Sequence, residues 1–193
     1  MVIHTNEKEG RTSWELDSYF FQQKRTVFIT GEITDALCEE ANRQILYLAW
    51  LSKDPITLRI NSRGGSVTAG LSLFDTMRGC GCEIITVCSG AAASMAAFIL
   101  AAGTPGKRYC APNAEIMIHQ IIGSASGQAS DIERTANHIR DVKKRYISLM
   151  AEMTGKDPEK IRTDTDRDCY MSAQEAVDYG IADRIGICLP DSC

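Results

Sequence analysis

The sequence predicts an α/β domain built on a largely parallel sheet, with one long helix that projects from it. Two observations support this fold class. Strand-like and helical segments alternate along most of the 193 residues, a rhythm typical of parallel strands covered by helices. No low-complexity segment or long linker divides the chain, and its length suits one domain with a sizeable core.

Strands are expected where β-branched and apolar residues run together or alternate with polar ones. Glycine-containing turns should follow two of these strands, at residues 61–65 and 89–90, and Gly31 should end another. The expected strands are residues 27–30, 56–60, 83–88 and 115–119.

Helices are expected between these strands. The first begins at a cap formed by Thr34 or Asp35, and a second covers residues 68–77. A third, rich in alanine, surrounds Ser94. The apolar positions of the first helix recur at intervals of three and four residues: Leu37, Ala41, Ile45 and Leu48.

One segment, at about residues 130–153, reads as a single helix of roughly 36 Å. Ser130 and Glu133 form a capping-box pattern at its start, and Gly155 lies near its end. We expect the helix to project and to bury its apolar stripe against a second copy of the chain. Packing across its own domain is the alternative. The stripe consists of Ile132, Ala136, Ile139, Val142, Tyr146 and Leu149.

Composition excludes several classes of function. The net charge is −4 and no cluster of Lys and Arg stands out, so nucleic acid is not an expected partner. The N-terminal residues are polar, and the most apolar segment, 91–102, is too short to cross a bilayer. We therefore expect a cytoplasmic protein. The eight cysteines show no zinc-site spacing and no disulfide framework is expected, so no metal site is predicted.

The candidate chemistry centres on Ser94 and His119. Ser94 follows a strand and a small-residue turn at the start of a helix, where unpaired N–H groups favour negative charge. His119 ends an apolar strand, the place where α/β folds carry active groups. The alternatives are a serine that only caps the helix and a structural histidine. His4 and His138 lie in a polar arm and in the long helix, and are weaker candidates.

Two further ingredients of acyl-transfer chemistry are present. Gly64 and Gly65 follow a strand and can turn backbone N–H groups toward a carbonyl oxygen, although an ordinary turn explains them equally well. An acid that orients the histidine is available among three aspartates, and the pattern alone does not choose between them. These are Asp164, Asp166 and Asp168.

Several segments resemble the ClpP family, the peptidase subunits of the caseinolytic Clp proteases. The resemblance covers about residues 27–186 and includes the glycine loop at 60–70, the serine segment at 90–95 and the histidine strand at 112–120. It continues into the start of the long helix at 127–133 and the aspartate segment at 164–176.

The resemblance implies a crotonase-like fold of stacked β-β-α units and a serine endopeptidase that cleaves unfolded polypeptides through an acyl-enzyme. It implies Ser94 as nucleophile, His119 as base and Asp168 as the orienting acid. It further implies backbone N–H groups of Gly65 and Met95 as the oxyanion hole. Asp166 and Arg167 resemble a pair that links ring contacts to the geometry of the triad.

The resemblance also implies an organisation and an assembly. Residues 1–26 would form an N-terminal arm at an axial pore, 27–187 the peptidase domain with a handle helix, and 188–193 a short tail. Two heptameric rings would stack through the handle helices into a tetradecamer, without a cofactor in this subunit. A partner AAA+ Clp ATPase would use ATP.

The sequence departs from the family pattern at two places. Arg63 replaces the usual proline before the two glycines, which puts substrate preference in doubt. At the outer rim only Val87 and Tyr109 keep the apolar bulk expected for docking of the ATPase. The other matching positions are Thr57, Arg59, Gly79, Ser89, Ala111 and Gly186.

These departures suggest a divergent paralogue that pairs with another ClpP subunit or uses a different activator. Three functions therefore remain open at this point. The chain is an active endopeptidase, a weakly active or regulatory ring subunit, or, more remotely, a member of the acyl-CoA hydratase branch of the same fold.

Overall fold

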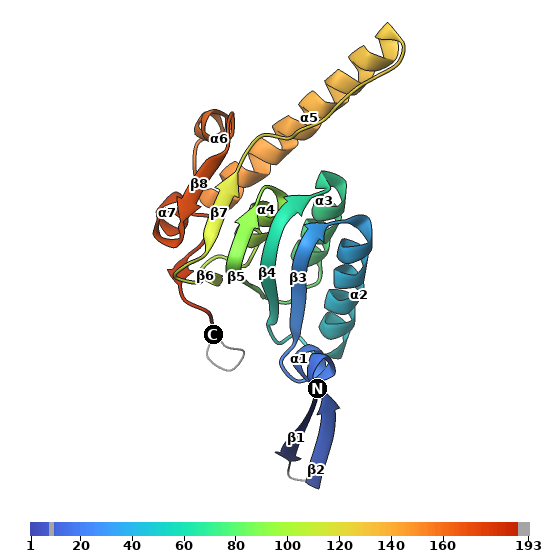
Figure 1. Cartoon of the computed structure of the whole chain (residues 1–193), viewed down its shortest axis with the longest axis vertical. Coiled ribbons are helices and arrows are strands. Elements are labelled where there is room, and N and C mark those ends of the chain that lie inside the picture. Colours follow the sequence, from blue (N-terminus) through green and yellow to red (C-terminus); the bar gives the residue numbers. More distant parts are fainter. Residues whose placement is uncertain (8–9, 189–193) are drawn as a thin grey trace.

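The structure, a computed structural model, describes residues 1–7 and 10–188. Its centre is a mostly parallel sheet in the order β3-β4-β5-β6-β9, with β7 beside β5 and β8 beside β7 (Figure 1). Only the β7–β8 pair of this sheet is antiparallel within the described residues. The mixed α/β class predicted from the sequence is confirmed. The strands are β3 (Thr26–Ile33), β4 (Ile56–Gly65), β5 (Ile84–Ala93), β6 (Arg108–Cys110), β7 (Glu115–Ile118), β8 (Cys169–Ser172) and β9 (Arg184–Ile185).

Helices cover the sheet and complete the core. Thr34 caps α2, because its hydroxyl accepts a hydrogen bond from the N–H of Leu37 at 3.2 Å. Every residue of α4 is buried, which explains why this helix is apolar on all sides. Helices of the described residues are α1 (Leu16–Gln22), α2 (Asp35–Leu51), α3 (Val67–Gly79), α4 (Met95–Ala101), α5 (Ala129–Thr154), α6 (Pro158–Asp164) and α7 (Ala173–Tyr179).

The turns expected at residues 61–65 and 89–90 are not present, because β4 and β5 continue through both segments. The end expected at Gly31 is also wrong, since β3 runs on to Ile33. The physical reason is a set of register shifts, between Thr30 and Glu32 and between Ile60 and Ser62. Glycines with positive φ bend the strands at these irregularities without ending them.

Helix α5 projects well beyond the body of the molecule (Figure 1). Its buried residues are confined to Tyr146, Met150 and Ala151, in the half that rests on the domain. The expected capping box is wrong, because the N-cap is Gln128 and makes no side-chain cap hydrogen bond. The predicted end is confirmed, with Gly155 in the left-handed conformation.

The N-terminal segment forms an antiparallel hairpin of β1 (Val2–Glu7) and β2 (Gly10–Glu15), followed by α1. The hairpin lies apart from the central sheet, at the opposite end of the molecule from α5 (Figure 1). The domain boundaries at 26 and 187 stay predictions. The expected tail, 188–193, lies outside the described residues except for Cys188. In the described part of the chain, no helix combines the length and apolar character needed to cross a membrane.

The buried cysteines behave as small apolar side chains. Burial raises the pKa of the Cys88 and Cys110 thiols to about 12, so both remain neutral. Cys188 is disulfide-bonded, which the sequence pattern did not predict. The free cysteines among the described residues are Cys38, Cys80, Cys82, Cys88, Cys110 and Cys169.

Arg108 ties the C-terminal elements to the core. Its guanidinium forms a two-pronged ion pair with Asp183, with Nη2 to Oδ1 at 2.6 Å and Nε to Oδ2 at 2.9 Å. The remaining amino group donates to the carbonyl oxygens of Met153 at 2.9 Å and Gly180 at 2.8 Å. Burial by itself raises the pKa of Asp183, but the hydrogen bonds and charge of Arg108 outweigh burial and lower it. One buried side chain of β6 therefore joins α5 to the segment between α7 and β9.

We predict that Arg108→Ala lowers the free energy of unfolding by about 3–5 kcal/mol, because it leaves the partly buried Asp183 without its partner. Chemical denaturation at neutral pH measures the loss. Lys107→Ala, which removes an exposed pair with Glu83, is the matched control and should cost less than about 1 kcal/mol.

The pH dependence of the unfolding free energy checks that the Arg108–Asp183 pair causes the loss. The folded carboxyl has a lowered pKa, so its contribution is fully present above the unfolded pKa and is lost as the pH falls through the folded pKa. The difference between Arg108→Ala and the wild type should therefore shrink in acid. Equal losses for Arg108→Ala and Lys107→Ala would contradict the prediction.

Candidate active site

Ser94 occupies a strained turn between β5 and α4. Its φ of 56° and ψ of −122° lie outside the regions that residues with a side chain favour. Its N–H donates to the carbonyl oxygen of Met117 in β7 at 2.8 Å, which fixes the turn against the neighbouring strand. Ser94 stands at the N-cap of α4 but makes no side-chain cap hydrogen bond. The alternative of a simple capping serine is therefore not supported, and the hydroxyl is free to face the cavity.

Glycines in β4 and α3 make room for this turn. A Cβ atom added to Gly64 would lie 2.7 Å from both the carbonyl oxygen of Ala93 and the Cβ atom of Ser94. A Cβ at Gly70 would collide with the side chain of Met95. Only glycine lets β4 and α3 approach the turn this closely. The Gly-Gly pair is thus part of the site's packing and is not an ordinary turn.

His119 lies against the hydroxyl of Ser94. The distance from His119 Nε2 to Ser94 Oγ is 2.7 Å, and the imidazole is 18% exposed. The pairing of β5 with β7 explains why Ser94 and His119 meet. The two strands are parallel, and Ala93 of β5 is in register with Met117 of β7. Side chains that follow the carboxyl ends of two neighbouring parallel strands lie at the same edge of the sheet. The pair has the geometry of a hydroxyl that gives its proton to an imidazole.

Asp168 approaches the other side of the imidazole. Its Oδ1 lies 3.4 Å from His119 Nδ1, and its side chain is 54% exposed. The antiparallel pairing of β7 with β8 places Cys169 opposite Ile118, so the residues next to them also meet. At 3.4 Å the distance between the two atoms is longer than that of a good hydrogen bond.

The other two candidate aspartates are engaged elsewhere. Asp164 accepts a hydrogen bond from the Tyr179 hydroxyl at 2.7 Å and pairs with Lys160 at 2.9 Å. Asp166 offers its backbone carbonyl to the amide of Gln120 at 3.0 Å, and its own side chain is exposed. The side chain of Arg167 is exposed as well, on the same short segment before β8. The structure therefore brings Asp168, and not Asp164 or Asp166, to the histidine.

A cavity of about 270 Å3 brings the predicted site residues together. Ser94 and His119 line it, as do Gly65 and Met95, the two residues predicted to supply backbone donors. Met95 is the first residue of α4, so its N–H has no acceptor within the helix. The rest of the wall comes from Arg63, Val67, Met117, Gln120, Ile121, Ile122 and Tyr146.

The apolar wall of this cavity was missed by the sequence analysis. Tyr146 belongs to the stripe expected to meet a partner, yet it is buried against the ring of Phe98 at a centroid distance of 5.4 Å. Ile121 and Ile122 follow His119 after the single residue Gln120, which was the available signal. The lining indicates a site that accepts apolar groups beside the reacting hydroxyl.

The outer positions expected to bind an ATPase are mostly covered or polar. Val87, expected to retain apolar bulk there, is fully buried and offers no exposed surface. Its strand neighbour Arg59 is half-buried and donates to the carbonyl oxygen of Cys188 at 2.7 Å. Burial lowers the pKa of Arg59. The C-terminal end of the described chain therefore lies over this part of the sheet.

Comparison with known protein families gives a match over most of the chain. A family model with the description Clp protease matches residues 9–187. The matched part includes Ser94, His119 and Asp168, together with the complete central sheet.

We predict that Gly64→Ala costs about 2–5 kcal/mol of unfolding free energy, because a methyl group meets the turn at Ser94 and the backbone has a φ of 97°. Gly31→Ala is the matched control. Gly31 lies on the adjacent strand with a φ of 86° and open space around its Cβ position, so only conformational strain of about 1–2 kcal/mol is expected. Equal losses in urea denaturation would show that the contact with Ser94 is not a constraint.

Proposed function

This chain belongs to the Clp protease family, and from that membership we propose that it is a serine endopeptidase subunit. Ser94 is the nucleophile, His119 the general base and Asp168 the group that orients the imidazole. The observation that carries the proposal is the 2.7 Å contact between Ser94 Oγ and His119 Nε2 at a strained turn. The substrates are unfolded polypeptides.

The reaction follows from the positions of these groups. Ser94 Oγ attacks the carbonyl carbon of the peptide as its proton passes to His119 Nε2. The N–H groups of Gly65 and Met95 stabilise the negative charge that develops on the carbonyl oxygen. His119 then gives the proton to the leaving amine, which leaves an acyl group on Ser94. Water, activated by His119, hydrolyses the acyl-enzyme and restores the serine.

The looser contact of Asp168 suggests that assembly completes the site. The 3.4 Å separation from His119 and the half-exposed carboxylate leave the imidazole less firmly held than a close hydrogen bond would. Asp166 and Arg167, both exposed on the segment that leads to Asp168, are the proposed ring-contact sensor. The same observation favours the second candidate function, a weakly active or regulatory ring subunit that needs another paralogue or a non-standard activator.

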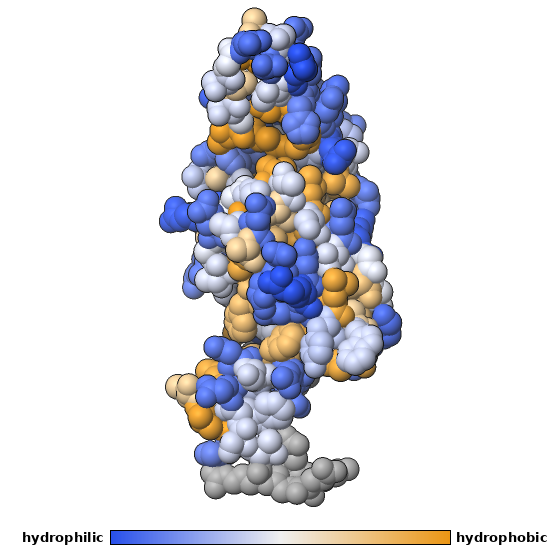
Figure 2. Space-filling view, turned by 90° about the vertical axis from the view of Figure 1, so that its right-hand side faces the viewer, coloured by the Kyte–Doolittle hydropathy of each residue, from blue (hydrophilic) through white to orange (hydrophobic). Residues whose placement is uncertain are grey.

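Family members generally form oligomeric rings, and we extend this to two stacked heptameric rings joined through α5. The support is the projection of α5, whose outer part keeps Ile132 41% exposed, with Ile122 of the neighbouring segment 79% exposed. Figure 2 shows apolar side chains gathered on one face near the projection. An AAA+ ATPase that docks on the outer face would meet Arg59 and the C-terminal segment instead of an apolar pocket.

A fluorophosphonate probe should label wild-type protein at Ser94, because the histidine activates that hydroxyl. Ser94→Ala should abolish labelling and the hydrolysis of a fluorogenic peptide. Asp168→Asn should lower the rate by about 10²- to 10⁴-fold, since it removes the charge that stabilises the protonated imidazole.

Folded Ser94→Ala protein, checked by its thermal unfolding, is the control for these assays. Labelling without measurable peptide hydrolysis would support the regulatory subunit. A wild-type chain that never labels, alone or mixed with a second ClpP paralogue, would contradict the peptidase proposal.

Ile132→Glu should separate the stacked rings, because it introduces a charge on the exposed apolar part of α5. Sedimentation velocity should then show a particle about half the mass of the wild-type assembly. Glu133→Ala, on the next residue and outside the apolar stripe, is the matched control and should leave the mass unchanged. An Ile132→Glu particle of wild-type mass would exclude α5 as the contact between rings.

A further inference from the structure

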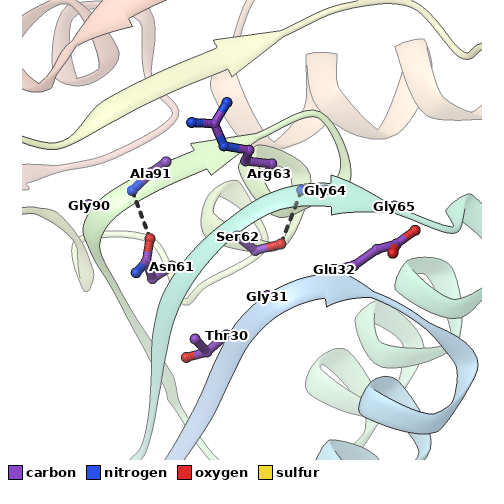
Figure 3. Close-up of a pocket in the computed structure, with 10 residues that line it drawn as sticks. All are labelled: Thr30, Gly31, Glu32, Asn61, Ser62, Arg63, Gly64, Gly65, Gly90 and Ala91. Atoms are coloured by element: carbon purple, nitrogen blue, oxygen red, sulfur yellow. Dashed lines mark hydrogen bonds between the residues drawn. The ribbon is translucent and has the colours of Figure 1, made fainter.

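Arg63 stands where the cavity beside Ser94 adjoins a second, larger cavity on the open face of the sheet. The larger cavity has a volume of about 830 Å3 and is lined by residues of β3, β4 and β5 (Figure 3). Arg63 and Gly65 line both cavities. A polypeptide that leaves the Ser94 cavity across β4 toward the larger one therefore passes Arg63.

The backbone that carries Arg63 is firmly held. The hydroxyl of Ser62 accepts a hydrogen bond from the N–H of Gly64 at 3.0 Å, and Asn61 Oδ1 accepts one from the N–H of Ala91 at 3.2 Å (Figure 3). Ser62 and Gly64 are buried, whereas Arg63 between them is exposed, as the alternation of a strand requires. The backbone position from which the Arg63 side chain reaches the cavities is thus fixed.

The guanidinium of Arg63 has no carboxylate partner within residues 1–7 and 10–188. Glu32 also lines the larger cavity, but the two side chains point in different directions (Figure 3). On the far side of the imidazole, Asp168 faces His119. The ammonium group of Lys143, from α5, is already engaged, because it donates to the side-chain oxygen of Gln120 at 2.7 Å. Arg63 therefore brings a positive charge to the site that remains available to a ligand.

We propose that Arg63 is a specificity-determining residue that favours substrates with a carboxylate side chain next to the scissile bond. The inference rests on the proposed function and names the substrate class of the same site. Val67 and Arg63 lie two residues on either side of Gly65, where the oxyanion would bind. Val67, the first residue of α3, lines the Ser94 cavity and meets one neighbour of the scissile bond. Arg63 lies roughly 7 Å from Gly65 along β4, at about 3.3 Å per residue, so its long side chain reaches the other neighbour. Apolar contacts hold the first, and the guanidinium pairs with the second.

The effect should be moderate because Arg63 is exposed to solvent. An exposed ion pair changes a rate or an affinity by about two- to fivefold, and salt weakens it. Replacing the acid of the substrate with a base exchanges attraction for repulsion, so the full range from acidic to basic substrates should reach roughly tenfold. Such a preference is small enough to leave the peptidase broad and large enough to measure.

The test uses the full-length chain and internally quenched peptides that differ at one position. Asp, Asn or Lys is placed in turn at the residues on each side of the scissile bond, and kcat/KM is measured at low and high salt. We expect the order Asp, Asn, Lys on one side only, and a smaller spread at high salt. Arg63→Gln should remove the order, Arg63→Glu should reverse it, and Arg63→Lys should keep it. Arg140→Gln removes an equal charge from the exposed surface of α5 and should keep the order.

The outcomes separate this inference from the proposed function. If Ser94 labels and peptides are cleaved with the same rates for Asp, Asn and Lys, the role of Arg63 is wrong and the peptidase stands. A preference that survives Arg63→Gln also overturns it. If the wild type neither labels nor cleaves any peptide, both proposals fail.

A binding measurement gives a readout that does not depend on turnover. Ser94→Ala protein should bind a fluorescent Asp peptide about two- to fivefold more tightly than its Asn counterpart in an anisotropy titration. The double variant Ser94→Ala/Arg63→Gln should bind both equally. Equal binding by Ser94→Ala protein would overturn the assignment even if hydrolysis is slow.

Discussion

The contact between Gly64 and the turn at Ser94 is the constraint on which the site depends. A serine with a φ of 56° and a ψ of −122° is costly, and it persists because β4, β5 and β7 surround it. Gly64 removes the one atom that would prevent β4 from reaching the turn. The same approach brings Gly65 to the cavity that contains Ser94. The nucleophile and one proposed oxyanion donor thus share a single packing requirement.

The two partners of the imidazole differ because different elements hold them. Ser94 follows β5 and His119 follows β7, and the parallel pairing of these two strands fixes their register. His119 Nε2 therefore lies 2.7 Å from Ser94 Oγ. Asp168 comes before the short strand β8, after an exposed segment, and reaches the imidazole only at 3.4 Å. Short strands and exposed connections are the less stable parts of a fold. We therefore expect the distance between Asp168 and His119 to vary more than the distance between Ser94 and His119.

Local sequence patterns predicted the alternation of strands and helices, the start of α2, the end of α5 and the two residues that meet in the site. Those features depend on periodicity, caps and strand ends, which a short window of sequence contains. The continuation of β4 and β5 through their glycines was not predictable in this way. A glycine that bends a strand and a glycine that ends one look alike until the neighbouring strand is known. The role of Tyr146 depended on Phe98, far away in the sequence.

Two hydrogen bonds through Gln120 link the projecting helix to the segment that leads to the proposed acid. Lys143 of α5 donates to the side chain of Gln120, and Gln120 donates to the backbone carbonyl of Asp166, two residues before Asp168. At the other end of α5, Arg108 holds the carbonyl oxygen of Met153 and so fixes the base of the helix to the core. We therefore expect a partner that binds the exposed part of α5 to act on the contact between Asp168 and His119, which is 3.4 Å long.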